Sequence, residues 1–184
     1  KDWSRTPLGP VQEWPPALRH ATSLMLQSPV PCAILWGEDA ILLYNDGYSR
    51  IADMRHPEIL GLPASQAWPE VAEWNRNVVS TVLAGETLSY RDLPLTLHRS
   101  GEAEDVWFDL DYSPILDEGG RAVGVFAVVV ETTGKVKTER ALAAQTALIE
   151  EANRRLSAES EFLQQLFEDA PSFMAMLVGP EHRF

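Results

Sequence analysis

The feature that most constrains the fold of this chain is the segment 123–130, in which every residue except Gly124 is apolar. A strand with one face in water alternates apolar and polar residues, whereas a run without a polar face belongs inside a sheet that is covered on both sides. A membrane-spanning helix needs about 20 apolar residues, so this run is too short to cross a bilayer. The segment therefore predicts a central strand of a sheet.

Four further segments complete the predicted sheet. Residues 32–36 and 41–44 are apolar runs that flank a turn, which is typical of a hairpin. Residues 106–115 alternate between apolar and polar side chains, and residues 93–97 contain a proline, which favours an edge strand because proline donates no ladder hydrogen bond. An antiparallel sheet of order 2-1-5-4-3 satisfies these constraints, because it places the first and the last strand side by side in its middle and the third at an edge.

Helices are predicted between the second and third strands, at 46–53, 64–68 and 69–84, and an amphipathic helix precedes the first strand. Asn45 is expected to cap the helix that follows it, because asparagine is among the preferred N-cap residues. Together with the five strands, these segments predict an α+β fold in which helices cover one face of the sheet.

The end of the chain echoes its beginning. Pro29, Ala33, Leu35 and Gly37 recur as identical residues 142 positions later, each set preceded by helical sequence. Similarity at this spacing predicts tandem copies of one module, the second cut short, so we expect the chain to be part of a longer protein. The predicted parts are an N-terminal Pro/Trp-rich segment with its helix (1–28), a sheet domain (29–133), a helical linker (134–169) and the start of a second sheet domain (170–184).

The predicted linker carries a heptad pattern. Residues 135–169 contain neither Pro nor Gly, and apolar residues recur at seven-residue spacing at Leu142, Ile149, Leu156 and Leu163. A period of 3.5 keeps one seam facing a partner helix, so the pattern predicts a coiled coil between two copies of the chain. The companion seam is mostly polar in either register, and the alternative is one long surface helix packed on its own domain. The two companion sets are Thr146, Asn153, Ser160 and Phe167, or Gln145, Ala152, Glu159 and Leu166.

Charge and cysteine content limit the partners. The formal net charge is −12, which disfavours nucleic acid and direct contact with anionic membranes, since both are bound through Lys/Arg patches. A single cysteine, Cys32, permits no internal disulfide and suits a reducing cytoplasm. The chain is therefore expected to be cytoplasmic.

Several short motifs, in their order and spacing, resemble PAS sensor domains over residues 2–133. They are Tyr44-Asn45 before a short helix, Ser113-Pro114-Ile115 before a Gly-rich hairpin turn, and Glu131-Thr132-Thr133 after the last strand. The opening, Asp2-Trp3-Ser4 with Thr6-Pro7-Leu8-Gly9 and Trp14-Pro15, is similar to a subgroup at the front of bacterial sensor histidine kinases. Residues 165–184 resemble the beginning of a second PAS domain.

The resemblance implies a dimeric sensor that catalyses nothing itself and sends its signal through the helical linker. In many PAS domains an acidic residue followed by Thr couples the last strand to the output helix, and Glu131, Thr132 and Thr133 occupy that junction. The common pattern is Asp-Ile-Thr, so the coupling residue stays open among the three. Ordinary capping of the helix by Thr132 or Thr133 is the alternative.

PAS domains commonly bind ligands in an apolar pocket between sheet and helices. A pocket here is expected to draw on six residues, which could equally be close-packed core. They are Leu35, Leu43, Phe108, Leu110, Tyr112 and Phe126.

Specific cofactor and enzyme chemistry finds little support in the sequence. Flavin photochemistry of the light-oxygen-voltage kind needs a Cys on a short helix, whereas Cys32 lies in a predicted strand, and the long helix offers no His for haem. No metal site or catalytic residue is predicted, and the cofactor is left unknown. Asp109 and Asp111 share one strand face with Arg91 and Asp92 near by, so an acid–base enzyme is the rival to a solvated face.

The predicted function is a sensory and dimerisation module of a two-component system, feeding a histidine kinase or another output domain of the same chain. The alternatives are a passive PAS dimerisation module without a ligand, or the input domain of a cyclic-dinucleotide enzyme.

Overall fold

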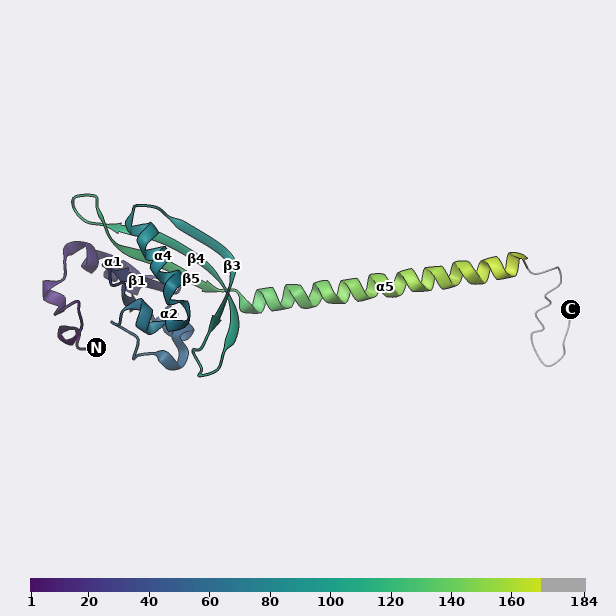
Figure 1. Ribbon diagram of the computed structural model, residues 1–184, viewed down its shortest axis with the longest axis horizontal. Coiled ribbons are helices and arrows are strands. Elements are labelled where there is room, and N and C mark those ends of the chain that lie inside the picture. The colour runs from purple at the N-terminus through teal and green to yellow at the C-terminus, as the bar shows by residue number, and fades with distance from the viewer. Residues whose placement is uncertain (170–184) are drawn as a thin grey trace. The chain divides into compact units, whose positions relative to one another are not determined.

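The sheet has the predicted topology. A computed structural model describes residues 1–169, and it contains one antiparallel sheet of strand order β2-β1-β5-β4-β3 (Figure 1). The strands are β1 (Cys32–Trp36), β2 (Ile41–Tyr44), β3 (Leu88–Leu97), β4 (Glu104–Leu116) and β5 (Ala122–Glu131). β5 lies between β1 and β4, so the apolar run is central, as its lack of a polar face predicts.

The helices follow the order that the sequence predicts, with a split where one long helix is expected. The segment 69–84 begins as a 3₁₀ turn and continues as an α-helix. The elements are η1 (Trp3–Arg5), η2 (Val11–Glu13), α1 (Pro16–Gln27), α2 (Asp46–Ala52), η3 (Asp53–Arg55), α3 (Ala64–Ala67), η4 (Pro69–Val71), α4 (Ala72–Leu83) and α5 (Thr133–Asp169).

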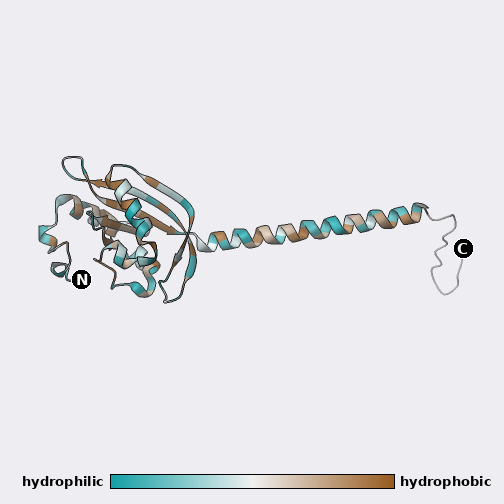
Figure 2. Cartoon of the chain, viewed as in Figure 1, coloured by the Kyte–Doolittle hydropathy of each residue, from teal (hydrophilic) through white to brown (hydrophobic). Residues whose placement is uncertain are grey.

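One face of the sheet forms a core with α2, α3 and α4. Side chains alternate along each strand, so Phe108, Leu110 and Tyr112 of β4 all point to this face, where they meet Val79 and Val82 of α4. Figure 2 shows apolar residues along the strands of this domain. The prediction that helices cover one face of the sheet is thereby confirmed.

The opposite face is covered in part by the N-terminal segment. Trp14, Leu18 and Met25 pack against Ile34 of β1 and Leu43 of β2. Trp14 is 5% exposed. The Pro/Trp-rich segment therefore belongs to the packed domain.

Asn45 joins three elements. Its side-chain oxygen accepts hydrogen bonds from the backbone N–H of Tyr48 in α2 and of Cys32 in β1, both at 3.0 Å. Its amide nitrogen donates to the carbonyls of Met25 (3.2 Å), Ser28 (3.3 Å) and Val30 (2.8 Å). The predicted N-cap role is confirmed, and the same side chain also ties the end of α1 to the sheet.

The chain divides into two units, Lys1–Lys137 with the sheet and a second that begins at Thr138 and holds the rest of α5. Over residues 1–169, no helix is both long enough and apolar enough to cross a bilayer. The predicted second sheet domain at 170–184 lies outside the described residues.

Candidate functional site

The end of β5 is held by a cluster of three charged residues, which we call the inner cluster: Arg99, Glu104 and Glu131. Arg99 lies in the β3–β4 loop and is 8% exposed. Its guanidinium donates to both oxygens of Glu131 (2.7 and 3.1 Å) and to both oxygens of Glu104 (2.8 and 3.1 Å). Paired N–H···O contacts of this kind fix geometry as well as adding energy. Glu131, the last residue of β5, is thereby held to the β3–β4 loop by Arg99.

The inner cluster is charged at neutral pH. The hydrogen bonds from Arg99 hold the pKa of Glu131 and the pKa of Glu104 below their usual range, and partial burial opposes this only in part. The two carboxylates in turn raise the pKa of Arg99. Each charged form thus stabilises the other.

The two threonines after Glu131 contact the neighbouring strand. The backbone N–H of Thr132 donates to the carbonyl of Trp107 in β4 at 2.7 Å, and the N–H of Trp107 donates to the hydroxyl oxygen of Thr133 at 3.0 Å. The carbonyl of Thr132 accepts the first helical bond from Val136 at 3.0 Å. The junction residues that the resemblance indicates therefore join the first turn of α5 to the sheet.

A second contact to α5, which we call the outer ion pair, joins Asp92 and Lys135. Their Oδ2 and Nζ atoms lie 2.9 Å apart. Asp92 stands at a register shift in β3 with φ of 47°, and its N–H donates to the carboxylate of Asp109 at 2.8 Å. The bulge points the Asp92 side chain at the helix. The hydrogen bond from Lys135 lowers the pKa of Asp92.

The aspartates considered as acid–base residues are engaged in structural contacts. Asp111 accepts from Arg91 (2.9 Å) and from the hydroxyl of Ser89 (2.6 Å), and Asp109 holds the Asp92 bulge. These hydrogen bonds lower the pKa of Asp111. The arrangement suits a braced sheet surface better than proton transfer.

A chain of contacts links the helical side to the inner cluster. Arg55 stacks over the ring of Trp68, 4.8 Å from its centroid, and forms an ion pair with Glu70 at 3.0 Å. Arg55 also donates to the carbonyl of His98 at 3.1 Å, and Glu70 accepts from the N–H of His98 at 2.8 Å. His98 precedes Arg99 in the chain. The residues around Trp68 and the end of β5 are therefore connected through polar contacts.

Arg99, Lys135 and Arg55 were not among the predicted site residues. Arg99 reaches its partners from a loop and Arg55 from the end of the short 3₁₀ helix η3, and the sequence pattern does not give the course of the chain at either place. The bulge has a sequence signal, because the apolar positions shift from even (Leu88, Tyr90) to odd (Leu93, Leu95) along β3. That phase change marks an extra residue in the strand.

The six predicted pocket residues lie on two faces of the sheet, which corrects the prediction. Four belong to the core under α2–α4, whereas Leu43 and Phe126 pack with the N-terminal segment. Both pair across the ladder with Ile34, so they share its face. The prediction selected apolar residues without determining on which face of the sheet each side chain lies. The four that stay together are Leu35, Phe108, Leu110 and Tyr112.

A small cavity of about 60 Å³ lies between the sheet and the helices. Aromatic side chains line much of it, including Tyr48, Trp68, Trp74 and Tyr112. Pockets for drug-sized ligands and cofactors measure roughly 300–1,000 Å³. The cavity is thus of a size for a few waters or a very small molecule.

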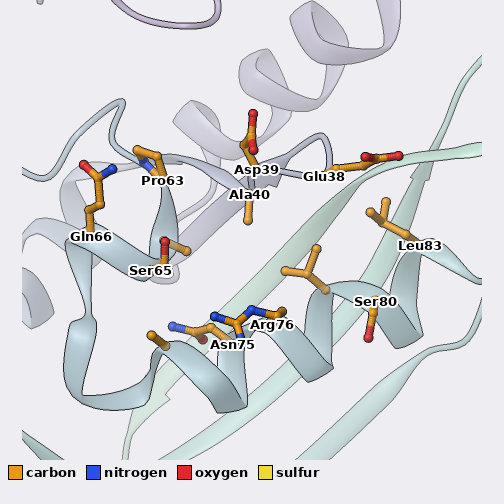
Figure 3. A pocket seen from close by; sticks show the side chains of 13 residues that line it. Glu38, Asp39, Ala40, Pro63, Ser65, Gln66, Asn75, Arg76, Ser80 and Leu83 are labelled. Carbon is orange, nitrogen blue, oxygen red and sulfur yellow. The ribbon is translucent and has the colours of Figure 1, made fainter.

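A larger groove of about 500 Å³ lies between the β1–β2 turn, α3 and α4 (Figure 3). Ala40, Val79 and Leu83 give it apolar surface, and Ser65 and Arg76 are among its polar side chains. Figure 3 shows Arg76 reaching from α4 between these elements. Its volume suits a small organic ligand.

The structure also places Cys32 and His56. Cys32 is a buried free thiol in β1. Nδ1 of His56 lies 3.0 Å from the hydroxyl of Tyr44, whose pKa burial raises to about 12. Among residues 1–169, no group of three or more His, Cys, Asp or Glu side chains is placed to hold a metal ion.

The four predicted coil residues lie along α5 and are exposed. Their exposed fractions are 62% for Leu142, 53% for Ile149, 64% for Leu156 and 47% for Leu163. They form one stripe because seven residues make nearly two turns of an α-helix. Further large apolar side chains of α5 are also exposed, among them Leu148 and Phe162.

Comparisons with solved structures reach TM-scores near 0.5 at low sequence identity. A light-oxygen-voltage protein of Rhodobacter sphaeroides has a TM-score of 0.50 and 16% identity, covering 84% of this chain and 98% of that one. An RNA-binding light-oxygen-voltage receptor has a TM-score of 0.50 and 16% identity over 80% of this chain, which spans only 42% of the receptor chain. A sensory box sensor histidine kinase from Vibrio cholerae has a TM-score of 0.43 and 17% identity, covering 62% and 87%. At these identities the likeness concerns the fold alone.

No curated protein matches the chain. A family model described as the PAS fold matches residues 26–137, which include all five strands and helices α2 to α4. The strand order and the helical cover on one face agree with that match. The chain belongs to the PAS family.

Proposed function

We propose that this chain is the sensory and dimerisation region of a cytoplasmic bacterial histidine kinase, and that it performs no catalysis itself. The observation that carries the proposal is the direct passage from sheet to helix. β5 ends at Glu131 and α5 begins at Thr133, and both sides of this junction are fixed by ion pairs. A displacement of the central strand would therefore move the first turn of α5.

The inner cluster is the proposed relay. Trp68 contacts Arg55, Arg55 contacts His98, and the next residue, Arg99, holds Glu131. A ligand or neighbouring domain that shifts the helical side can act on β5 through these contacts. Such a ligand or domain would act by favouring one of two arrangements of β5 and α5 that are similar in free energy.

The relay can be tested by hydrogen exchange at the start of α5. In Arg99→Met the carboxylate of Glu131 loses its partner, so we expect faster exchange of the amides of residues 133–142 with little change in α4. Arg91→Met, which removes an exposed ion pair on β3, is the control. Unchanged exchange at 133–142 in Arg99→Met would contradict a relay through the inner cluster.

Ligand sensing is separable from passive dimerisation. The cavity of about 60 Å³ between the sheet and the helices is far below the space that a flavin needs, so we expect no stabilisation by flavin mononucleotide. The groove beside α4 is the candidate site for a small metabolite. Thermal shift against metabolite, haem and flavin panels distinguishes the two functions. A chain that nothing stabilises would be a passive module.

Dimerisation through α5 is the second part of the proposal. Charges at two successive seam positions, Ile149→Asp with Leu156→Asp, should convert a dimer into a monomer in light scattering. Ala147→Asp with Ala158→Asp introduces the same charge away from the seam and should leave the dimer intact. A mass that is the same for both double variants would contradict a coil along the Leu142–Leu163 stripe.

A further inference from the structure

The polar residues beside the seam distinguish two ways of pairing α5 with a second copy. From them we infer that α5 forms a parallel coiled coil in one particular register, in which Asn153 faces the partner's Asn153 across the axis. This inference rests on the proposed dimer and goes beyond it, since it assigns the orientation, the register and the residue that selects them.

The exposed apolar surface of α5 calls for a partner. Eight large apolar side chains of this helix are between 47% and 72% exposed. Burial of such side chains stabilises an interface by roughly 25 cal/mol per Å². The strict seven-residue spacing of four of them fits a second helix of the same period. The eight are Leu142, Leu148, Ile149, Leu156, Phe162, Leu163, Leu166 and Phe167.

The two registers differ in what the companion seam buries. If Ile149 and Leu156 occupy d positions, the a positions are all neutral. If they occupy a positions, Glu159 falls at d, where it would face the same carboxylate of the partner. Two like charges at a desolvated contact are costly. The neutral a set is Thr146, Asn153, Ser160 and Phe167.

The other register has one compensation. Leu148 and Phe162 would lie at its g positions and be partly covered, whereas in the favoured register they lie at c. Partial cover of these two side chains recovers only part of the stabilisation that full burial would give. Burying an unpaired charge on each of the two facing carboxylates costs more than this partial cover recovers. The balance favours the neutral seam.

The charged residues of this stretch also suit the favoured register. Glu151 binds Arg154 at 2.9 Å and Arg155 at 2.8 Å within the helix. In this register Glu151, Arg154 and Arg155 take positions f, b and c, which point away from the seam. The other register moves Arg155 to g, a flanking position that also accepts charged residues, so these ion pairs are compatible with the favoured register without deciding between the two.

Asn153 and Thr146 can each form a hydrogen bond at an a position. The hydroxyl of Thr146 donates to the carbonyl of Leu142 at 3.0 Å, so its donor is satisfied inside the helix. A carboxamide carries both a donor and an acceptor, so two facing asparagines can bond to each other in a parallel, in-register pair. A single asparagine at an a position is known to specify register and the two-stranded state.

Disulfide trapping tests the register. In a Cys32→Ala background, one cysteine is placed at each of three positions. Ser160→Cys lies at a in the favoured register, Ala152→Cys lies at d in the other, and Ala158→Cys points outward in both. Facing a and d cysteines of a parallel pair come within disulfide reach, whereas outward ones do not. Covalent dimer is measured over time on non-reducing gels, with total mass by light scattering.

We expect Ser160→Cys to crosslink at least about tenfold faster than Ala152→Cys and Ala158→Cys. Fastest crosslinking at 152 would overturn the register, and a dimer that crosslinks at none of the three would overturn the parallel orientation. A monomeric mass would instead remove the proposed dimer itself. Asn153→Leu should lower the ratio of the 160 rate to the 152 rate by about tenfold. An unchanged ratio would show that Asn153 does not select the register.

Discussion

The inner cluster holds the end of β5 and the outer ion pair holds the start of α5, and the two differ in burial. Arg99 has a side chain 9% exposed and is held by two carboxylates, whereas the side chains of the outer ion pair, Lys135 and Asp92, are 53% and 35% exposed. Exposed pairs contribute about 0–1 kcal/mol, because water competes for both charges, whereas loss of one member of a buried pair costs several times more. The comparison indicates a firm attachment of β5 beside a loose attachment of the helix.

The largest effect is expected for Arg99→Met. Loss of the guanidinium leaves Glu104 and Glu131 facing each other without a counter-charge. Because these two side chains are 39% and 29% exposed, water replaces part of the interaction, and the free energy of unfolding should fall by about 2–3 kcal/mol. Urea unfolding at neutral pH measures the change. Arg91→Met is the matched control, and an equal loss in both variants would remove the distinction between buried and exposed pairs.

A smaller loss is expected for Glu131→Gln. The amide still accepts one hydrogen bond from Arg99, and Glu104 keeps the positive charge paired, so the free energy of unfolding should fall by about 1 kcal/mol. Urea unfolding again measures it. Combined with Arg99→Met, the two losses should be far from additive, since both residues belong to one network. Additive losses would mean that the two side chains act independently.

Acid should weaken the inner cluster in a defined pH range. The pKa values of Glu104 and Glu131 are lowered in the folded chain from an ordinary 4.5. Their contribution is therefore complete above about pH 4.5 and is lost as the pH falls through the lowered values. The difference in unfolding free energy between the native sequence and Arg99→Met should shrink below pH 4.5. A difference that stays constant down to pH 3 would contradict this assignment.

The smallest effect is expected for Lys135→Met. Loss of the outer ion pair should change the free energy of unfolding by no more than about 0.5 kcal/mol, and 0.5 M salt should abolish that change because the pair is exposed. Arg19→Met removes one positive charge from an exposed position of α1 and serves as the control. A loss above 1 kcal/mol for Lys135→Met alone would place the outer pair on a level with the inner cluster.

The strand order could be predicted from the sequence because the spacing of apolar residues along a strand shows which of its faces are buried. The unbroken apolar run at 123–130 predicts a central strand, the proline in β3 predicts an edge, and both positions are found. The pattern does not show, however, to which face of the sheet each side chain of a short apolar run points. In Ile41–Tyr44 every residue is buried, so the pattern does not show that Leu43 faces away from the α2–α4 core.

Of the residues in the proposed relay, the sequence predicts those at the end of β5 but not Arg99. Glu131, Thr132 and Thr133 lie at an element boundary, which the pattern locates, but Arg99 is 32 residues earlier in a loop. No periodicity fixes where a loop places a guanidinium. The outer pair depends on a bulge, whose phase change is visible in the sequence, while its contact to Lys135 requires the three-dimensional course of β3.

The hydrogen bonds of Asn45 have a consequence for cooperativity. Its carboxamide nitrogen donates to the carbonyls of Met25, Ser28 and Val30, and its oxygen accepts from β1 and from α2. Shortening the chain to begin at residue 29 would remove two of those acceptors and the Trp14 packing together. We therefore expect the first 28 residues to melt in the same transition as the sheet, as an integral part of the smallest unit able to fold.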